Sequence, residues 1–175
     1  MIKKIIIAIV LLLVVAAGAL FAINGKDTYQ ADKFSASASN GLNVGSQVEF
    51  TIPDQFDNSH SLTKETKTVI LAFAKSTGHT VKQFLSQQDK EYLPSKNALF
   101  VADISPMPTV IRNTFALPDL KKSSFSVLLI YDEKIATKLK NPKQEDKIAI
   151  VSLENGVVTN VDYILSEDEL TQALN

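Results

Sequence analysis

Apolar and polar positions divide the chain into three zones. Residues 1–23 contain a run from 5 to 23 without a charged side chain, and residues 24–43 are polar and follow no regular period. From residue 44 onward, short apolar runs alternate with polar turns. This pattern predicts a signal peptide or N-terminal transmembrane anchor over 1–23, a flexible linker over 24–43 and one folded domain over 44–175.

Two short strands are expected at the start of the folded domain. Apolar and polar residues alternate over 48–52, which predicts a half-buried strand, and Pro53 ends its pairing. The Asp-Asn-Ser sequence at 57–59 predicts a turn, after which 60–62 begin a return strand. Residues 68–74 are apolar on both faces, so they suit a central strand that is covered on two sides.

Helices and strands then alternate along the chain, and prolines separate several of them. Alternation of this kind predicts a central, largely parallel sheet with helices on both faces. The expected elements are a helix that begins near Thr77 or Gly78 and ends at Pro94, a strand at 98–105, a helix at 109–116 that Pro118 breaks, a strand at 125–133 and a short helix at 134–140.

The clearest local signals lie in the last segment. Two apolar runs in 147–164 flank Asn155 and Gly156, a dipeptide that is typical of a tight hairpin turn. Ser166 and Glu169 have the spacing of a capping box, in which each side chain bonds the other residue's backbone N–H at a helix start. The expected fold class is therefore α/β, with a central mixed β-sheet, an N-terminal β-hairpin and a C-terminal β-hairpin plus helix.

The apolar run at 5–23 has two interpretations. Lys3 and Lys4 form the basic flank that both a signal peptide and an anchor require. An Ala-Gly-Ala sequence at 17–19 offers a cleavage site, whereas the length of the run fits a membrane span of about 17–25 residues better. Under both interpretations the domain is exported, so it is periplasmic, secreted or anchored to the inner membrane and facing the periplasm.

Composition excludes several kinds of site. The net charge of −1 gives no basic field for nucleic acid. The absence of cysteine excludes disulfides, zinc–thiolate sites and thiol catalysis. The two histidines, His60 and His79, have no metal-ligating partner at helical spacing, and the turn with Asp54, Asp57 and Asn58 does not complete a calcium loop. We therefore expect neither a metal nor another cofactor.

Three segments together resemble the thioredoxin-like fold. KIAIVSLENGVVTNVDYILSEDELTQAL at 147–174 is similar to the final hairpin and helix of these proteins, and VGSQVEFTIPDQFDNSHSL at 44–62 to the opening hairpin of the peroxiredoxin branch. VILAFAKSTGHTVKQFL at 69–85 is similar to the strand, redox turn and helix. The likeness covers about 44–174 and extends to exported bacterial proteins of the YtfJ type. It implies a thioredoxin-like domain.

The chain departs from this family at the redox site. The resemblance places Thr77 and Thr80 on the two positions of the Cys-x-x-Cys pair. The family also has a cis-proline just before the strand matched by KIAIVSL, where this chain has Glu145 and Asp146, with Pro142 further upstream. The resemblance therefore implies the fold without thiol–disulfide oxidoreductase activity and with an altered substrate groove.

The segment Thr77-Gly78-His79-Thr80 is the first candidate site, as a degenerate redox site. His79 is poorly placed to take a proton from either threonine, because neighbouring residues on a helix point in different directions. One interpretation is that Ser76 or Thr77 caps the helix. The other is that exposed backbone N–H groups at the helix start bind a ligand. No catalytic residue is expected.

Four further residues are candidates for binding. Asp103 ends a predicted strand, and sites in α/β sheets gather at the carboxyl ends of strands. Met107, Arg112 and Phe115 belong to the segment around the helix at 109–116, where Arg112 is the only arginine of the chain. Methionine suits an adaptable interaction groove. The alternatives are that Asp103 caps the following helix or faces solvent, and that the helix at 109–116 simply packs against the core.

Functions of different classes remain open at this point. The first is a non-redox binding or scaffolding module in the bacterial envelope, with an envelope protein as its partner. Residues 5–23 would tether it to the inner membrane if the leader is not cleaved. The second is an oxidoreductase, flavin-linked or peroxidase-like, that works without thiols. A third is a structural protein that only spaces other envelope components.

Overall fold

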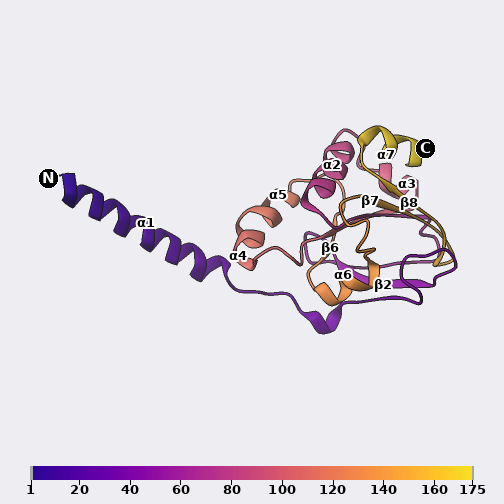
Figure 1. The fold of residues 1–175 in the computed structure, drawn as a ribbon, viewed down its shortest axis with the longest axis horizontal. Coiled ribbons are helices and arrows are strands. Elements are labelled where there is room, and N and C mark those ends of the chain that lie inside the picture. The colour runs from indigo at the N-terminus through magenta and orange to yellow at the C-terminus, as the bar shows by residue number, and fades with distance from the viewer. Residues whose placement is uncertain (1, 175) are drawn as a thin grey trace.

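The computed structural model describes residues 2–174, and one long helix stands apart from the rest (Figure 1). Helix α1 (Ile2–Asn24) extends away from the folded domain, and none of its residues is buried. Its 23 residues rise about 34 Å, close to the thickness of a bilayer's hydrocarbon core. The helix is long and apolar enough to cross a membrane, a test that a signal sequence passes as well.

A five-stranded mixed sheet forms the centre of the domain. Its strand order is β6-β5-β4-β7-β8, with β4, β5 and β6 parallel and with β7 and β8 antiparallel to their neighbours. The central position of β4 confirms the strand predicted at 68–74. The bounds are β4 (Thr68–Ala72), β5 (Ala98–Asp103), β6 (Leu128–Ile130), β7 (Ile148–Glu154) and β8 (Val157–Ile164).

A smaller antiparallel sheet contains β1 (Ser35–Ala38), β2 (Val48–Pro53) and β3 (Ser59–Ser61). The β2–β3 hairpin confirms the predicted pair of strands. Strand β1 corrects the prediction of a flexible linker throughout 24–43, because Ala36 is 4% exposed and pairs with Phe50 of β2. Pairing with a distant strand decides the structure of this segment, whose own Ser and Ala residues have little strand preference.

The helices lie mainly in the crossovers between strands of the central sheet. A five-residue π-helical turn (Arg112–Ala116) joins α4 to α5, so the three form one irregular helical segment. The bounds are α2 (Lys75–Ser86), α3 (Tyr92–Ser95), α4 (Thr109–Ile111), α5 (Leu117–Leu120), α6 (Glu133–Leu139) and α7 (Glu167–Leu174), with a 3₁₀ turn at Ala31–Lys33.

Two helix predictions were wrong in their extent. The helix expected to run to Pro94 ends at Ser86, and α3 is a separate short helix. The helix expected to break at Pro118 continues to Leu120. Proline removes one backbone donor from a helix, and the wider π-helical turn directly before Leu117 changes the bonding register so that the chain can stay helical through the proline.

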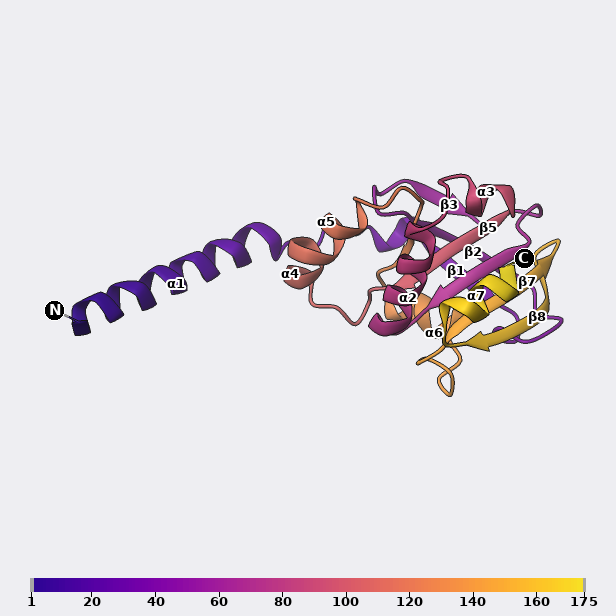
Figure 2. The same ribbon diagram turned by 90° about the horizontal axis from the view of Figure 1, so that it is seen from above.

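Alternate side chains of β4 enter two separate hydrophobic cores. Val69 and Leu71 belong to a core that lies between the central sheet and the layer formed by β1, β2 and α6. Ile70 and Ala72 belong to the opposite core, which α2, α3 and α7 cover. Figure 2 shows α2 and α7 together on one side of the sheet, where they contact each other. Helices therefore cover both faces, as predicted.

The structure confirms the predicted C-terminal hairpin and the helix that follows it. Asn155 and Gly156 have φ angles of 53° and 81°, as a two-residue type I′ turn requires. At the start of α7, the backbone N–H of Glu169 donates to the Ser166 hydroxyl over 3.3 Å. The Glu169 carboxylate accepts from the N–H groups of Leu165 and Ser166 at 2.8 and 3.0 Å. This is the predicted capping box.

Candidate functional site

The turn that the resemblance matched to a redox site is a helix start built from backbone bonds. The N-cap residue is Ala74, which corrects the prediction of a cap at Ser76 or Thr77. Thr77 lies three residues inside α2 and is 4% exposed. Its hydroxyl accepts from the Ala74 N–H at 3.2 Å and donates to the Ala74 carbonyl at 2.8 Å. The hydroxyl therefore serves the helix start.

The other residues of this turn do not assemble a catalytic pair. The Thr80 hydroxyl donates to the Ser76 carbonyl over 3.2 Å, one helical turn earlier. His79 is exposed, and among the described residues no hydrogen bond joins it to Thr77 or Thr80. Space is open beside Gly78. A hydroxyl needs a base within hydrogen-bond reach to act as a nucleophile, and this geometry does not provide one.

The four residues proposed for binding have different surroundings. Asp103 is half-buried at the end of β5 and accepts from the Ser105 N–H at 2.9 Å, and burial raises the pKa of its carboxyl. It therefore caps a turn before α4. Met107 is half-buried, and the Phe115 side chain is 64% exposed. Arg112, by contrast, is 4% exposed and lines a polar cavity.

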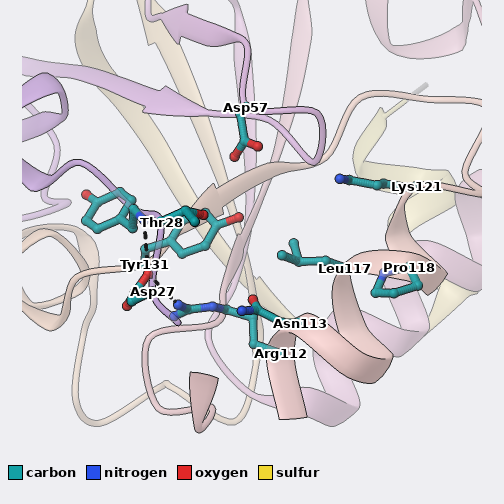
Figure 3. Close-up of a pocket in the computed structure, with 10 residues that line it drawn as sticks. Asp27, Thr28, Asp57, Arg112, Asn113, Leu117, Pro118, Lys121 and Tyr131 are labelled. Carbon is teal, nitrogen blue, oxygen red and sulfur yellow. Dashed lines mark hydrogen bonds and ion pairs between the residues drawn. The ribbon is translucent and has the colours of Figure 1, made fainter. Parts of the chain in front are cut away.

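This cavity, of about 240 Å³, lies at the carboxyl end of β6 (Figure 3). Three parts of the chain enclose it: the segment that follows α1, the β2–β3 turn, and the irregular segment from α4 to α5. Carboxylates, cations and two aromatic rings line the same space. The polar and aromatic lining residues include Asp27, Tyr29, Asp57, Asn113, Lys121 and Tyr131.

Arg112 is held between an acid and an aromatic ring. Its Nη2 lies 2.8 Å from Oδ1 of Asp27, and its Cζ lies 4.7 Å from the centre of the Tyr131 ring. The Tyr29 ring stacks on the Tyr131 ring, and their centroids lie 4.9 Å apart. The Nε of Arg112 is buried and has no hydrogen-bond partner among residues 2–174. An ion pair and a cation–π contact thus fix the guanidinium.

Burial and charge shift the acidities around Arg112. Burial raises the pKa of Tyr131 to about 12, and the Asp57 carboxylate adds to the shift, so the phenol stays protonated and can donate a hydrogen bond. Burial alone would raise the pKa of Asp27, but the Tyr29 N–H and the Arg112 guanidinium lower it below its usual value. At neutral pH the cavity therefore contains a charged Asp27–Arg112 pair beside a neutral phenol.

Asn113 attaches the segment after α1 to the domain. Its Nδ2 donates to the backbone carbonyls of Asn24 and Lys26 at 2.9 and 3.0 Å. Together with the Asp27–Arg112 pair, these bonds hold residues 24–29 against the irregular helical segment. The region expected to be a free linker therefore begins with a docked stretch.

Comparison with known proteins identifies the fold only. No protein-family model matches the chain, and no curated protein matches its sequence. Among solved structures, a candidate protein disulfide isomerase from Bacteroides thetaiotaomicron is similar with a TM-score of 0.50 and 14% identity, over 80% of this chain and 89% of that one. The chain has a thioredoxin-like fold.

Two further solved structures are similar over comparable lengths. Peroxidoxin BcpB from Mycobacterium tuberculosis has a TM-score of 0.49 and 14% identity, over 80% of this chain and 94% of that one. A candidate thiol:disulfide interchange protein DsbE from Chlorobium tepidum has a TM-score of 0.49 and 16% identity, over 77% of this chain and 100% of that one. Identities this low describe the backbone and leave the chemistry of this thioredoxin-like domain to its own residues.

The sequence predicted Arg112 as a binding residue of the thioredoxin-like domain but missed its surroundings. Asp27 lies in the predicted linker, Tyr131 in a predicted strand end, and Asn113 in a helix, so no short-range pattern joins them. One signal was available: a chain with a single arginine, in a segment with apolar neighbours, needs an acidic partner if that arginine is buried. The sequence does not show which of its 19 acidic residues is the partner of Arg112.

Proposed function

We propose that the protein is an exported, membrane-anchored thioredoxin-like domain that binds or scaffolds other components of the bacterial envelope without redox chemistry. The apolar helix α1 and the basic pair Lys3 and Lys4 in its first turn support the anchor. Because Asn113 binds the backbone directly after α1, the anchored domain would lie close to the membrane surface.

The hydrogen bonds of the Thr77 hydroxyl give the main support for this proposal. A redox or hydrolytic role at this turn would need a side chain that reaches a substrate, whereas the Thr77 hydroxyl is buried and bonds the Ala74 backbone in both directions. The absence of cysteine removes the disulfide chemistry itself. At this end of the sheet, the polar cavity around Arg112 is the site for a partner. It lies beyond the carboxyl end of a strand, where open α/β sheets bind ligands.

Site-specific crosslinking in native bacterial envelopes tests the binding role. A photoreactive amino acid at Lys121, on the rim of the cavity, is expected to capture a defined envelope protein. The same amino acid at Asp162, exposed on β8, is the matched control and should not capture it. Equal capture from both positions would contradict a role of this surface. Flavin absorbance or thiol-dependent turnover by the purified protein would contradict the non-redox assignment.

Mass measurement of the mature protein tests the anchor. We expect the membrane fraction to contain a chain that keeps the apolar run at 5–23. A mature chain that starts near Leu20, released from the membrane by a salt wash, would show that the leader is cleaved. The domain would then be free in the periplasm or secreted.

A further inference from the structure

We propose that the cavity around Arg112 is a binding site for an extended peptide segment that carries a carboxylate two residues before an aromatic side chain. The chain's own Asp27-Thr28-Tyr29 occupies this site, and a partner segment of the same chemistry would replace it. The inference deepens the proposed binding function, on which it rests, by naming the chemistry of the partner.

The part of the site that binds a carboxylate is the buried Arg112 guanidinium, whose partner in the chain is exposed. The Arg112 side chain is 4% exposed, whereas the Asp27 side chain paired with it is 50% exposed. A buried guanidinium needs an anion, because leaving it unpaired in a low-dielectric surrounding is costly. Since the anion comes from an exposed segment beside the membrane helix, another carboxylate can replace it without disturbing either core.

The aromatic half of the site is the face of Tyr131. Arg112 contacts this ring at 4.7 Å, and Tyr29 stacks on it with an interplanar angle of 9°. Within the part of the chain that the structure describes, the Tyr29 hydroxyl has no hydrogen-bond partner, so the contact depends on the ring and not on the phenol. Any flat aromatic side chain can make the same stacking contact.

Asn113 supplies a contact that does not depend on the ligand's sequence. Its side chain donates to two backbone carbonyls, that of Asn24 at the end of α1 and that of Lys26. Backbone carbonyls are present in every peptide segment, whatever its side chains. The site therefore combines a backbone contact with one charge-specific and one ring-specific contact, as peptide-binding surfaces do.

The site has room that the chain's own segment leaves unfilled. With Asp27 and Tyr29 seated, a cavity of about 240 Å³ remains between Tyr131 and the α5 side, where Leu117 and Lys121 face it (Figure 3). A partner with a second acidic group can extend toward Lys121. Such a partner would compete with an intramolecular segment whose effective concentration is on the order of millimolar.

Peptide binding to the full chain in nanodiscs tests this inference. The probe is a fluorescently labelled peptide with the sequence of residues 24–34, NGKDTYQADKF. The receptor is the variant with Asp27→Asn and Tyr29→Ala, which weakens the chain's own segment. We expect this variant to bind the probe about tenfold more tightly than the wild type does, because the competing segment no longer holds the site.

The decisive controls alter the peptide and leave the receptor unchanged. A probe with Asn in place of the Asp that corresponds to Asp27, or Ala in place of its Tyr, should bind the opened receptor at least about tenfold more weakly. Equal affinity for these probes, or for a scrambled peptide of the same composition, would overturn the inference. An Arg112→Lys receptor keeps the charge but loses the planar fork, and it should lose most of the preference for the Asp-containing probe.

The two proposals fail in different ways. If crosslinking at Lys121 captures an envelope protein but the opened receptor does not prefer the Asp-containing probe, the binding module stands and this peptide chemistry is wrong. If the probe binds as expected but no envelope protein is captured, the site exists and the proposed envelope role fails.

Discussion

Thr77 shows how one residue can keep a position in a fold while its chemistry changes. It lies in the turn where the resemblance predicts a cysteine, yet its hydroxyl closes the first turn of α2 by bonding Ala74. A capping hydroxyl is worth about 0.5–2 kcal/mol to a protein's stability. The Thr77 side chain therefore stabilises the fold, and its hydroxyl is not free to react with a substrate.

The change Thr77→Val tests this role, because valine keeps the shape and removes the hydroxyl. We expect the free energy of unfolding to fall by about 1 kcal/mol. The matched control is Thr80→Val in the same helix. That hydroxyl is half-exposed and bonds only the carbonyl four residues earlier, so the change should cost less than about 0.5 kcal/mol. Urea denaturation measures both, and equal costs would contradict a special role for Thr77.

Asp54 is a second residue whose role lies in the fold. It is 5% exposed and organises the β2–β3 turn by accepting from the backbone N–H groups of Phe56 and Asn58 at 2.8 and 2.9 Å. Its second oxygen lies 3.0 Å from Nε2 of His60. Burial alone would raise the pKa of Asp54, but His60, Asn58 and the backbone donors lower it below its usual value. The turn considered as a calcium loop is thus closed by its own hydrogen bonds.

The lowered pKa of Asp54 gives a pH dependence with a definite sign. A carboxyl whose pKa is lower in the folded state stabilises the protein above its unfolded pKa, and this stabilisation is lost as the pH falls below about 4. The change Asp54→Asn should lower the free energy of unfolding by about 1–3 kcal/mol at pH 7 and less at pH 3. Denaturation at both pH values measures it. Asp146→Asn, at an exposed loop position, should change stability equally little at both.

At the scale of elements, two glycines have opposite roles. Gly156 lies in the β7–β8 turn at a φ of 81°, and a Cβ there would lie 2.7 Å from Nε2 of Gln47. Gly78 lies inside α2 with open space around it. A glycine is needed in the hairpin turn, because other residues are strained at that backbone angle, whereas in the helix it only adds flexibility to the unfolded chain.

The same substitution at these two glycines should therefore change stability in opposite directions. Gly156→Ala is expected to lower the free energy of unfolding by roughly 1–2 kcal/mol, because the alanine is strained at positive φ. Gly78→Ala is expected to raise it by about 0.5–1 kcal/mol. Thermal unfolding of the two variants measures the difference. A stabilising Gly156→Ala would show that the turn differs from the type I′ geometry.

Elements also differ in how far their sequences predict them. The β7–β8 hairpin follows from alternation and an Asn-Gly turn, signals that act over a few residues. Strand β1 has no such signal, because its four residues are Ser and Ala and become a strand only by pairing with β2. The helix through Pro118 is similar, since the π-helical turn before it is a departure that helix propensities do not predict.

At the scale of the whole molecule, the connection between α1 and the domain is a docked segment. Asn113 and Arg112 hold it, and Tyr29 stacks between Tyr131 and Phe34, with 5.5 Å between the centroids of Tyr29 and Phe34. The domain is therefore held beside the end of α1. Under the proposed anchoring, displacing the segment would lengthen the tether and free the domain to move away from the membrane.

Loosening this docked segment should make it accessible to protease. The change Asn113→Ala removes both bonds to the backbone carbonyls of Asn24 and Lys26. We expect trypsin to cleave the full chain in nanodiscs after Lys26 several-fold faster, because local opening becomes easier. Asn160→Ala, at an exposed position on β8, is the control and should leave the rate unchanged. An unchanged rate in both variants would show that Asn113 does not hold the segment.

Features that depend on near neighbours could be read from the sequence alone. The apolar leader, the strand alternation, the Asn-Gly turn, the capping box and the absence of cysteine are properties of short stretches or of composition, and they predicted an α/β domain without thiol chemistry. The resemblance of three segments then implied the thioredoxin-like fold. The sequence also predicted Arg112 as a residue of interest.

Long-range packing, by contrast, determines which reactive side chains meet. Asp27, Arg112 and Tyr131 meet because α1's end, the irregular helical segment and β6 converge at one edge of the sheet. The buried Arg112 guanidinium needs an acidic partner, and the folded backbone determines which of the acids can reach it. Long-range packing of this kind leaves no period or spacing in the sequence.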